Sequence, residues 1–253
     1  MKYITPITSP GSLMRLRNKG FTLVELLIVI AIVAIMATIA LPNMSQWIAS
    51  RRAASKAEQV ANLLRFARTE AVRLNTIVYV CPVQIRKDAT PNVYCNADHA
   101  EQGLAAFADN NKTDNNNKKG LYQRGEDIDL RTVILNSPDK DNPKKLNKKI
   151  AYQVSTHNFS AESTGKDLIW GFMPDGTFGH KANADDKLNP STGFVKISLT
   201  DAAAVSEADK KARSTIVILD SAGRATVCSG NSDGGTNTTE VMKNLCQYES
   251  ASQ

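Results

Sequence analysis

An apolar run of 21 residues near the N-terminus is the feature that most constrains this chain. Residues 21–41 read FTLVELLIVIAIVAIMATIAL, in which only Thr22, Glu25 and Thr38 interrupt the apolar side chains. At about 1.5 Å per residue, a helix of this length covers roughly 30 Å, the thickness of a bilayer core. The run therefore predicts a transmembrane helix.

The charges around this run predict its orientation. Residues 1–20 contain Lys2, Arg15, Arg17 and Lys19 and no acid, so four units of the net charge of +6 lie there and +2 remains for the other 233 residues. A basic leader stays in the cytoplasm, which places the remainder in the periplasm. The nearly neutral remainder argues against a broad nucleic-acid-binding surface.

Glu25 does not suit a plain anchor or a secretory signal. A signal peptide has a shorter apolar core that ends at a small-residue site, whereas this run ends at Leu41-Pro42-Asn43. An unpaired carboxylate in lipid costs roughly 2–3 kcal/mol. Glu25 is therefore a candidate functional residue that needs a cation as its partner.

The helical pattern continues beyond Pro42. Apolar residues recur at spacings of three and four, which is typical of an amphipathic helix. We expect one helix over residues 22–74, kinked at Pro42 and closed by Asn75. The stripe consists of Val60, Leu63, Leu64, Ala67, Ala71 and Leu74.

The remainder predicts a small β domain with long polar loops, so the expected fold class is α+β with antiparallel sheets. The boundaries are residues 1–20 for a leader, 21–44 for the membrane half of the helix, and 45–253 for the periplasmic part. The expected strands are 76–81, 103–108, 131–136, 150–154, 168–172, 177–179, 194–199, 214–219 and 225–228.

Four cysteines allow three disulfide pairings, and an oxidising periplasm permits them. We favour the pairing that is local in sequence, Cys81 with Cys95 and Cys228 with Cys246. Free thiols are an alternative. A zinc site is disfavoured because no close Cys-x-x-Cys pair is present.

Other chemistry has little support in the sequence, and we expect no cofactor, no metal and no enzyme activity. His99, His157 and His180 are scattered, which favours surface or loop positions. A lysine cluster precedes the expected strand at 150 and reads either as a solvated loop or as a phosphate-contacting patch. It consists of Lys140, Lys144, Lys145, Lys148 and Lys149.

Lys19-Gly20-Phe21-Thr22-Leu23-Val24-Glu25 resembles the processing site of type IV prepilins and pseudopilins. The resemblance implies that a prepilin peptidase cleaves after Gly20 and that Phe21 is then N-methylated. It also implies that Glu25 pairs with the N-terminal amine of a neighbouring subunit, and that the region of Pro42 extends during assembly.

The body resembles the GspH/FimT group of this superfamily. The similarity lies in Cys81-Pro82 with Cys95, in Gly103–Phe107, in Trp170–Gly176 and in Gly223-Arg224. DNA-binding members of the group carry a Gly-Arg-x-Arg run in the last hairpin. Arg224 matches its first arginine, and Thr226 stands at the second. The candidate DNA-contacting residues are Arg224, Lys144, Lys145, Lys148 and Lys149.

The resemblance implies a FimU-like minor type IV pilin. Such a subunit resides in the inner membrane and then in the pilus, where it helps to prime or cap assembly. The implied partners are the prepilin peptidase, minor and major pilins, and the inner-membrane assembly platform. Two alternatives stay open, a FimT-like DNA-uptake pilin and a GspH-type pseudopilin of type II secretion.

Overall fold

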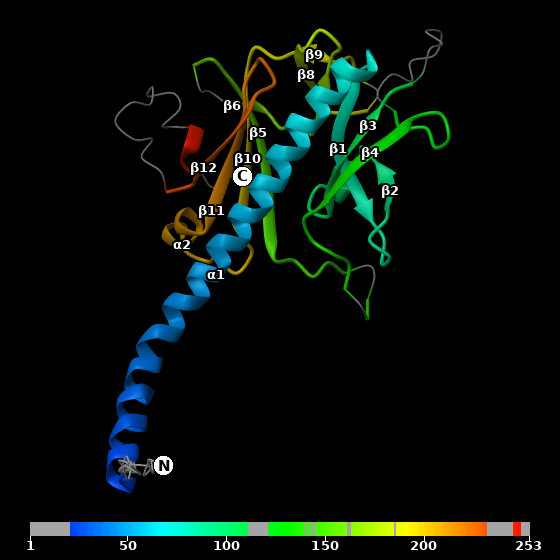
Figure 1. The fold of residues 1–253 in the computed structure, drawn as a ribbon. Coiled ribbons are helices and arrows are strands. Elements are labelled where there is room, and N and C mark those ends of the chain that lie inside the picture. Colours follow the sequence, from blue (N-terminus) through cyan, green and yellow to red (C-terminus); the bar gives the residue numbers. More distant parts are fainter. Residues whose placement is uncertain are drawn as a thin grey trace, which may run out of the picture. The chain divides into compact units, whose positions relative to one another are not determined.

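The computed structural model describes residues 21–110, 121–139, 141–142, 145–160, 163–184, 186–231 and 245–248, without the side chains of residues 39–43. The chain divides into two compact units, residues 1–44 and 45–253. The predicted α+β class is confirmed, because one long helix is followed by strands that pair antiparallel (Figure 1). The predicted leader, with Gly20, lies outside the described residues.

The long helix, α1 (Leu23–Leu74), has 52 residues and nearly the predicted bounds. It ends at Asn75, whose φ of 52° is the left-handed conformation that commonly closes a helix. The kink predicted at Pro42 falls among residues 39–43, whose side chains are not described, so it stays a prediction.

The N-terminal part of α1 exposes its apolar side chains. Phe21 is 80% exposed and Leu23 75%, and the large apolar residues that follow, as far as Met36, are also exposed. Over the described residues, no helix reaches the combined length and apolarity of a membrane span. The predicted span is therefore not confirmed.

The strands form two antiparallel sheets. The seven-stranded sheet has the order β4-β3-β1-β7-β8-β9, with β2 paired to β1, and the five-stranded sheet has the order β12-β11-β10-β5-β6. The seven strands are β1 (Val78–Ile85), β2 (Pro91–Tyr94), β3 (Gly103–Ala108), β4 (Ile128–Ile134), β7 (Ile169–Phe172), β8 (Phe178–Lys181) and β9 (Asn189–Pro190). The five are β5 (Ile150–Asn158), β6 (Ser163–Gly165), β10 (Gly193–Asp201), β11 (Ser214–Leu219) and β12 (Ala225–Ser229).

The C-terminal half of α1 packs against both sheets in one hydrophobic core. Its buried stripe is dominated by small side chains, which let strands from both sheets approach the helix. The helix contributes Ala53, Ala57, Val60, Ala61, Leu63, Leu64, Ala67 and Ala71. The sheets contribute Val80, Leu104, Trp170 and Phe172 from one side and Val154, Val195, Ile197 and Val217 from the other.

Basic side chains of α1 bind the outer strand of each sheet. Lys56 Nζ donates to the carbonyl of Ile134 at the end of β4 over 2.6 Å. Arg65 donates from Nε and Nη2 to the carbonyl of Ala225 at the start of β12, over 3.3 and 2.9 Å. One helix therefore holds an edge of each sheet by hydrogen bonds as well as by apolar contact.

The chain passes between the sheets at three places, and each passage is held by a particular contact. Between β4 and β5, the buried Asn136 side chain bonds the main chain of Glu101, Lys149 and Ile150. Between β6 and β7, Asp167 contacts Thr156 of β5 and His180 of β8. Between β9 and β10, Gly193 lies so close to β5 that an added Cβ would stand 1.9 Å from the carbonyl oxygen of His157.

Two short helices and three short strands were not expected from the sequence. The helices are η1 (Ala97–His99) and α2 (Glu207–Ala212), and the strands are β2, β6 and β9. The expected strand at 131–136 is displaced, because β4 covers Ile128–Ile134. The strands at 103–108 and 214–219 have the expected bounds.

Gly193→Ala should lower the free energy of unfolding by about 3 kcal/mol or more, because the methyl group can be accommodated only if β5 and β10 separate. The measurement is denaturant unfolding of the purified chain in detergent. Gly165→Ala is the matched control, since its nearest neighbour is 4.0 Å away, at Asp167 Oδ1. Equal stability of the two variants would contradict this reading of the close approach.

Candidate functional site

The start of α1 forms a capping arrangement that the sequence analysis did not identify. The side-chain oxygen of Thr22 accepts a hydrogen bond from the backbone N–H of Glu25 over 3.2 Å. Thr22 and Glu25 have the Thr-x-x-Glu spacing of a capping box, and the acid lies in the first turn, where the helix dipole favours negative charge. Glu25 thus has a local role in addition to any role in assembly.

The carboxylate of Glu25 is exposed. Within the described ranges, no Lys, Arg or His lies within ion-pair distance of it. It is surrounded in sequence by exposed apolar residues, among them Phe21 and Leu23. A carboxylate that enters an apolar environment needs a cation, and this part of the chain offers none.

The lysine cluster lies on the passage from β4 to β5. Lys145, Lys148 and Lys149 are exposed, and Lys144 and Lys140 lie outside the described residues. Lys148 Nζ pairs with Glu101 over 2.5 Å, which removes part of the cluster's positive charge.

The structure does not bring Arg224 to the lysine cluster. Arg224 follows β11 and pairs with Asp220 over 2.8 Å. Lys149 lies near the opposite end of β11. Its carbonyl accepts a hydrogen bond from the backbone N–H of Ala202, which follows β10. At that end of β10, Thr200 pairs with Ser214, the first residue of β11. The length of β11 separates the two by roughly 17 Å at 3.4 Å per residue. The candidate DNA-contacting residues therefore do not form one patch.

The cysteines form two disulfides, Cys81–Cys95 and Cys228–Cys246, which is the pairing favoured from the sequence. The first joins β1 to the end of β2. The second attaches residues 245–248 to β12, where Leu245 packs with Ile216 and Ile218. In the chain-entropy model, a closed loop of about 15 residues contributes roughly 3 kcal/mol.

The expectation of surface or loop histidines is wrong for two of the three. His157 is buried in β5 and bonds to Ser155 over 2.8 Å. His180 of β8 pairs through Nδ1 with Asp167 over 2.5 Å, and its side chain is only 14% exposed. Both rings lie in strands, where each contacts a polar side chain, Ser155 for His157 and Asp167 for His180. The sequence alone did not indicate these contacts.

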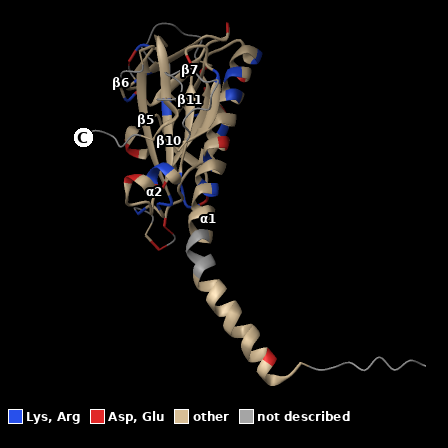
Figure 2. Ribbon diagram, turned by 90° about the vertical axis from the view of Figure 1, so that its left-hand side faces the viewer, with Lys and Arg blue, Asp and Glu red and all other residues tan. Residues whose placement is uncertain are grey.

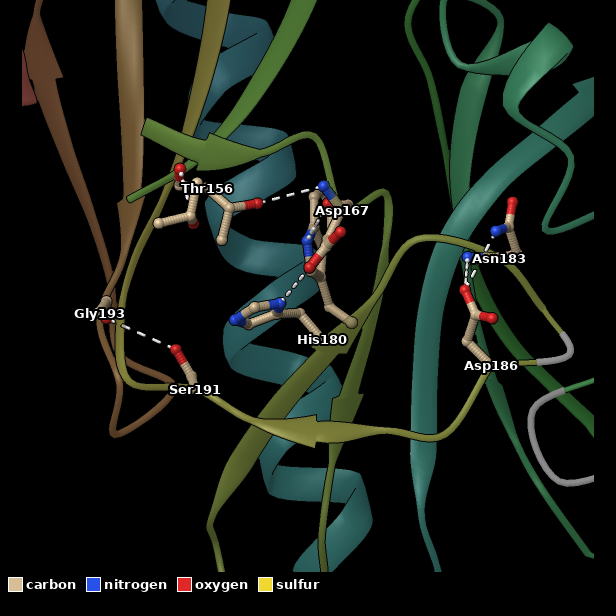
Figure 3. Close-up of polar contacts among 9 residues, drawn as sticks. Thr156, Asp167, His180, Asn183, Asp186, Ser191 and Gly193 are labelled. Carbon is tan, nitrogen blue, oxygen red and sulfur yellow. Dashed lines mark hydrogen bonds and ion pairs between the residues drawn. The ribbon is translucent and has the colours of Figure 1, made fainter. Parts of the chain in front are cut away.

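Asp167 connects the two sheets (Figure 3). Its backbone N–H donates to Thr156 Oγ1 of β5 over 3.1 Å, while its carboxylate binds His180 of β8. Its carbonyl accepts from Trp170 Nε1 over 3.1 Å. In the part of the chain that the structure describes, no three His, Cys, Asp or Glu side chains are placed to hold a metal ion.

A tyrosine cluster covers the outer face of the seven-stranded sheet. Tyr94 and Tyr122 stack at 3.8 Å between ring centroids, and both hydroxyls donate to the carboxylate of Asp129, over 2.7 and 2.9 Å. Burial, and then the bond to Asp129, raise the pKa of Tyr122 to about 12. Burial, and then the charge of Asp109, raise the pKa of the neighbouring Tyr79 to about 12.

Comparison with known proteins gives two family matches. Residues 15–41 match the prokaryotic N-terminal methylation motif, and residues 56–178 match the model of type II transport protein GspH. The type IV major fimbrial protein FimA of Dichelobacter nodosus is 28% identical over 183 residues, which cover 72% of this chain and 100% of that protein.

Two crystal structures of the type IV minor pilin FimU of Pseudomonas aeruginosa are also similar. One is 15% identical with a TM-score of 0.37 and covers 70% of this chain and 88% of its own. The other is 16% identical with a TM-score of 0.35 and covers 68% and 90%.

Asp167→Ala should lower the free energy of unfolding by about 1–3 kcal/mol, because it leaves the partly buried His180 ring without its carboxylate. Thermal unfolding at neutral pH measures the change. Glu207→Ala removes an acid whose side chain is 57% exposed and pairs with Lys210, so it should change stability by less than about 1 kcal/mol. A loss no larger than that of Glu207→Ala would show that Asp167 does not hold the sheets together.

The tyrosines predict a loss of stability at high pH. Unfolded tyrosine has a pKa of about 10, and folded Tyr79 and Tyr122 have raised values of about 12. Their stabilisation is therefore complete below pH 10 and is lost as the pH rises through 12. Thermal midpoints across this range, with tyrosinate absorbance, provide the measurement, and Tyr79→Phe should reduce the loss. A midpoint that stays constant over this range would contradict the assignment.

Proposed function

Since the chain is a type IV pilin-like protein of the GspH type, we propose that it is a minor type IV pilin that helps to prime or cap pilus assembly with other minor pilins. Proteins of this family are structural, and the proposal assigns the chain no catalysis of its own. Its implied partners are other minor pilins, the major pilin, the prepilin peptidase and the inner-membrane assembly platform.

The observation that carries this proposal is the combination found at the start of α1. An exposed apolar helix begins with Phe21, and it carries a carboxylate at Glu25 with no cation near it among the described residues. The N-terminal methylation motif covers the same residues. Cleavage after Gly20 would create a new amine at Phe21, and such an amine on a neighbouring subunit is the cation that Glu25 lacks.

In this proposal the chain has one location before pilus assembly and another after it. Before assembly, residues 21–44 hold it in the inner membrane, with the body in the periplasm. After assembly, the apolar side chains pack against those of other subunits and the body lies on the fibre. Two disulfides support an oxidising compartment for the body.

A GspH-type pseudopilin of type II secretion is the second candidate, and the match of residues 56–178 to the GspH model favours it. The two candidates differ in what a deletion strain loses. Loss of surface pili with normal protein secretion supports the minor pilin. Loss of secretion with normal pili supports the pseudopilin.

Glu25→Ala should leave the chain in the membrane but reduce its amount in sheared pili by roughly tenfold, because an apolar fibre interior does not bind the amine without the carboxylate. Immunoblots of the membrane and sheared fractions measure the ratio. Glu58→Ala is the matched control, since it removes an acid from an exposed pair of the same helix. Normal incorporation of Glu25→Ala would overturn the role given to Glu25.

A further inference from the structure

A groove of about 410 Å³ lies between α1 and β4, outside the segment that carries the proposed function. Lys56, Gln59 and Asn62 of α1 form one wall, and residues 131–134 of β4 form the other. β4 is an outer strand of its sheet, so one side of its main chain meets no further strand among the described residues.

The free side of β4 faces this groove. Ile134 offers its carbonyl to Lys56 of α1 rather than to β3, which lies on the other side. The direction of main-chain hydrogen bonding alternates along a strand, so the N–H and C=O of Thr132 also point to the groove. An extended segment that lies beside β4 could form hydrogen bonds with these main-chain groups. Sheets bind peptides in this way by strand addition.

The charge of the groove is positive. The Arg131 guanidinium lies 5.5 Å from the centre of the Phe66 ring, and over the described residues no carboxylate is within ion-pair distance of it. Lys56 is held partly buried at the opposite wall, and burial lowers its pKa. Figure 2 shows basic residues along the C-terminal half of α1, the half that packs against the sheets.

The acids nearest in sequence are engaged elsewhere. Glu58 lies 3.8 Å from the guanidinium of Arg65. Asp129 accepts hydrogen bonds from Tyr94 and Tyr122 on the outer face of the sheet. The groove thus has two cations and an open strand edge, and its lining contains no acid.

We propose that this groove binds an extended acidic segment of another pilin subunit, which adds alongside β4 and places a carboxylate between Lys56 and Arg131. The proposal deepens the function proposed above and rests on it for the identity of the partner. The strand edge supplies affinity, and the two cations supply selection for acidic segments.

The first test uses the purified full chain in detergent and a labelled hexapeptide of alternating glutamate and valine. Fluorescence anisotropy should detect binding, and the same peptide with lysine in place of glutamate should not bind. Arg131→Gln should weaken binding by roughly fivefold or more. Lys211→Gln, which removes an exposed charge on α2, should weaken it less than about twofold.

A second variant tests strand addition separately from charge. Thr132→Pro removes an N–H that faces the groove and no bond to β3, so it should abolish peptide binding while the thermal midpoint stays near that of the parent. Absence of binding, equal binding of the lysine peptide, preferred binding of a short oligonucleotide, or indifference to Arg131→Gln and Thr132→Pro would each overturn the proposal.

A photo-cross-linking residue at position 132 extends the test to sheared pili. Cross-links to an acidic segment of another pilin, identified by its peptide mass, support the proposal. A chain that is present in pili without such cross-links overturns this inference and leaves the proposed function intact. A chain that is absent from pili overturns the proposed function, and the peptide assay then decides whether the groove binds acidic strands.

Discussion

The structure of the body depends on the burial of one narrow stripe of α1. The stripe is made largely of alanines, which include Ala53, Ala57, Ala67 and Ala71, all with no exposed surface. Small side chains allow strands from two sheets to meet the same helix, and larger residues such as Trp170 and Phe172 fill the space from the opposite side. Without the helix, each sheet would expose its apolar inner face to water.

Polar contacts and one close backbone approach also connect the two sheets. Asn136, Asp167 and Gly193 each stand where the chain leaves one sheet for the other. Asn136 uses its amide nitrogen and oxygen on the main chain of Ile150, and Gly193 permits a backbone approach that any side chain would prevent. These contacts join the two sheets at particular residues, in addition to the apolar core that the sheets share.

Much of this fold could be predicted from the sequence, because long periodic patterns decide it. The helix was predicted within about one residue at its start, and Asn75 closes it in the expected conformation. Strands such as β3 and β11, buried over their whole length, were also found. The short strands β6 and β9 were missed, since two or three residues carry no periodicity and pair only because their neighbours hold them.

Only the part of the site that lies within a short stretch of sequence could be predicted. A local motif at Phe21–Glu25 is readable in sequence, and a Thr-x-x-Glu spacing was present there but was not interpreted as a cap. The contact of His180 with Asp167 joins β8 to the segment before β7, and the groove beside β4 joins that strand to α1, which lies far from it along the chain. Such contacts depend on topology, which amino-acid pattern alone does not supply. The lysine cluster and Arg224 illustrate the converse, since similar charge did not imply proximity.

The two basic contacts from α1 to the sheet edges have a consequence for the chain before it meets its partners. An open strand edge invites pairing with any other open edge, which leads to aggregation. Arg65 occupies the first carbonyl of β12, and Lys56 occupies the last carbonyl of β4. A neutral strand that approaches either edge must displace a bonded cation without compensation. The helix that builds the core thereby also covers one outward carbonyl on an edge of each sheet with a bonded cation.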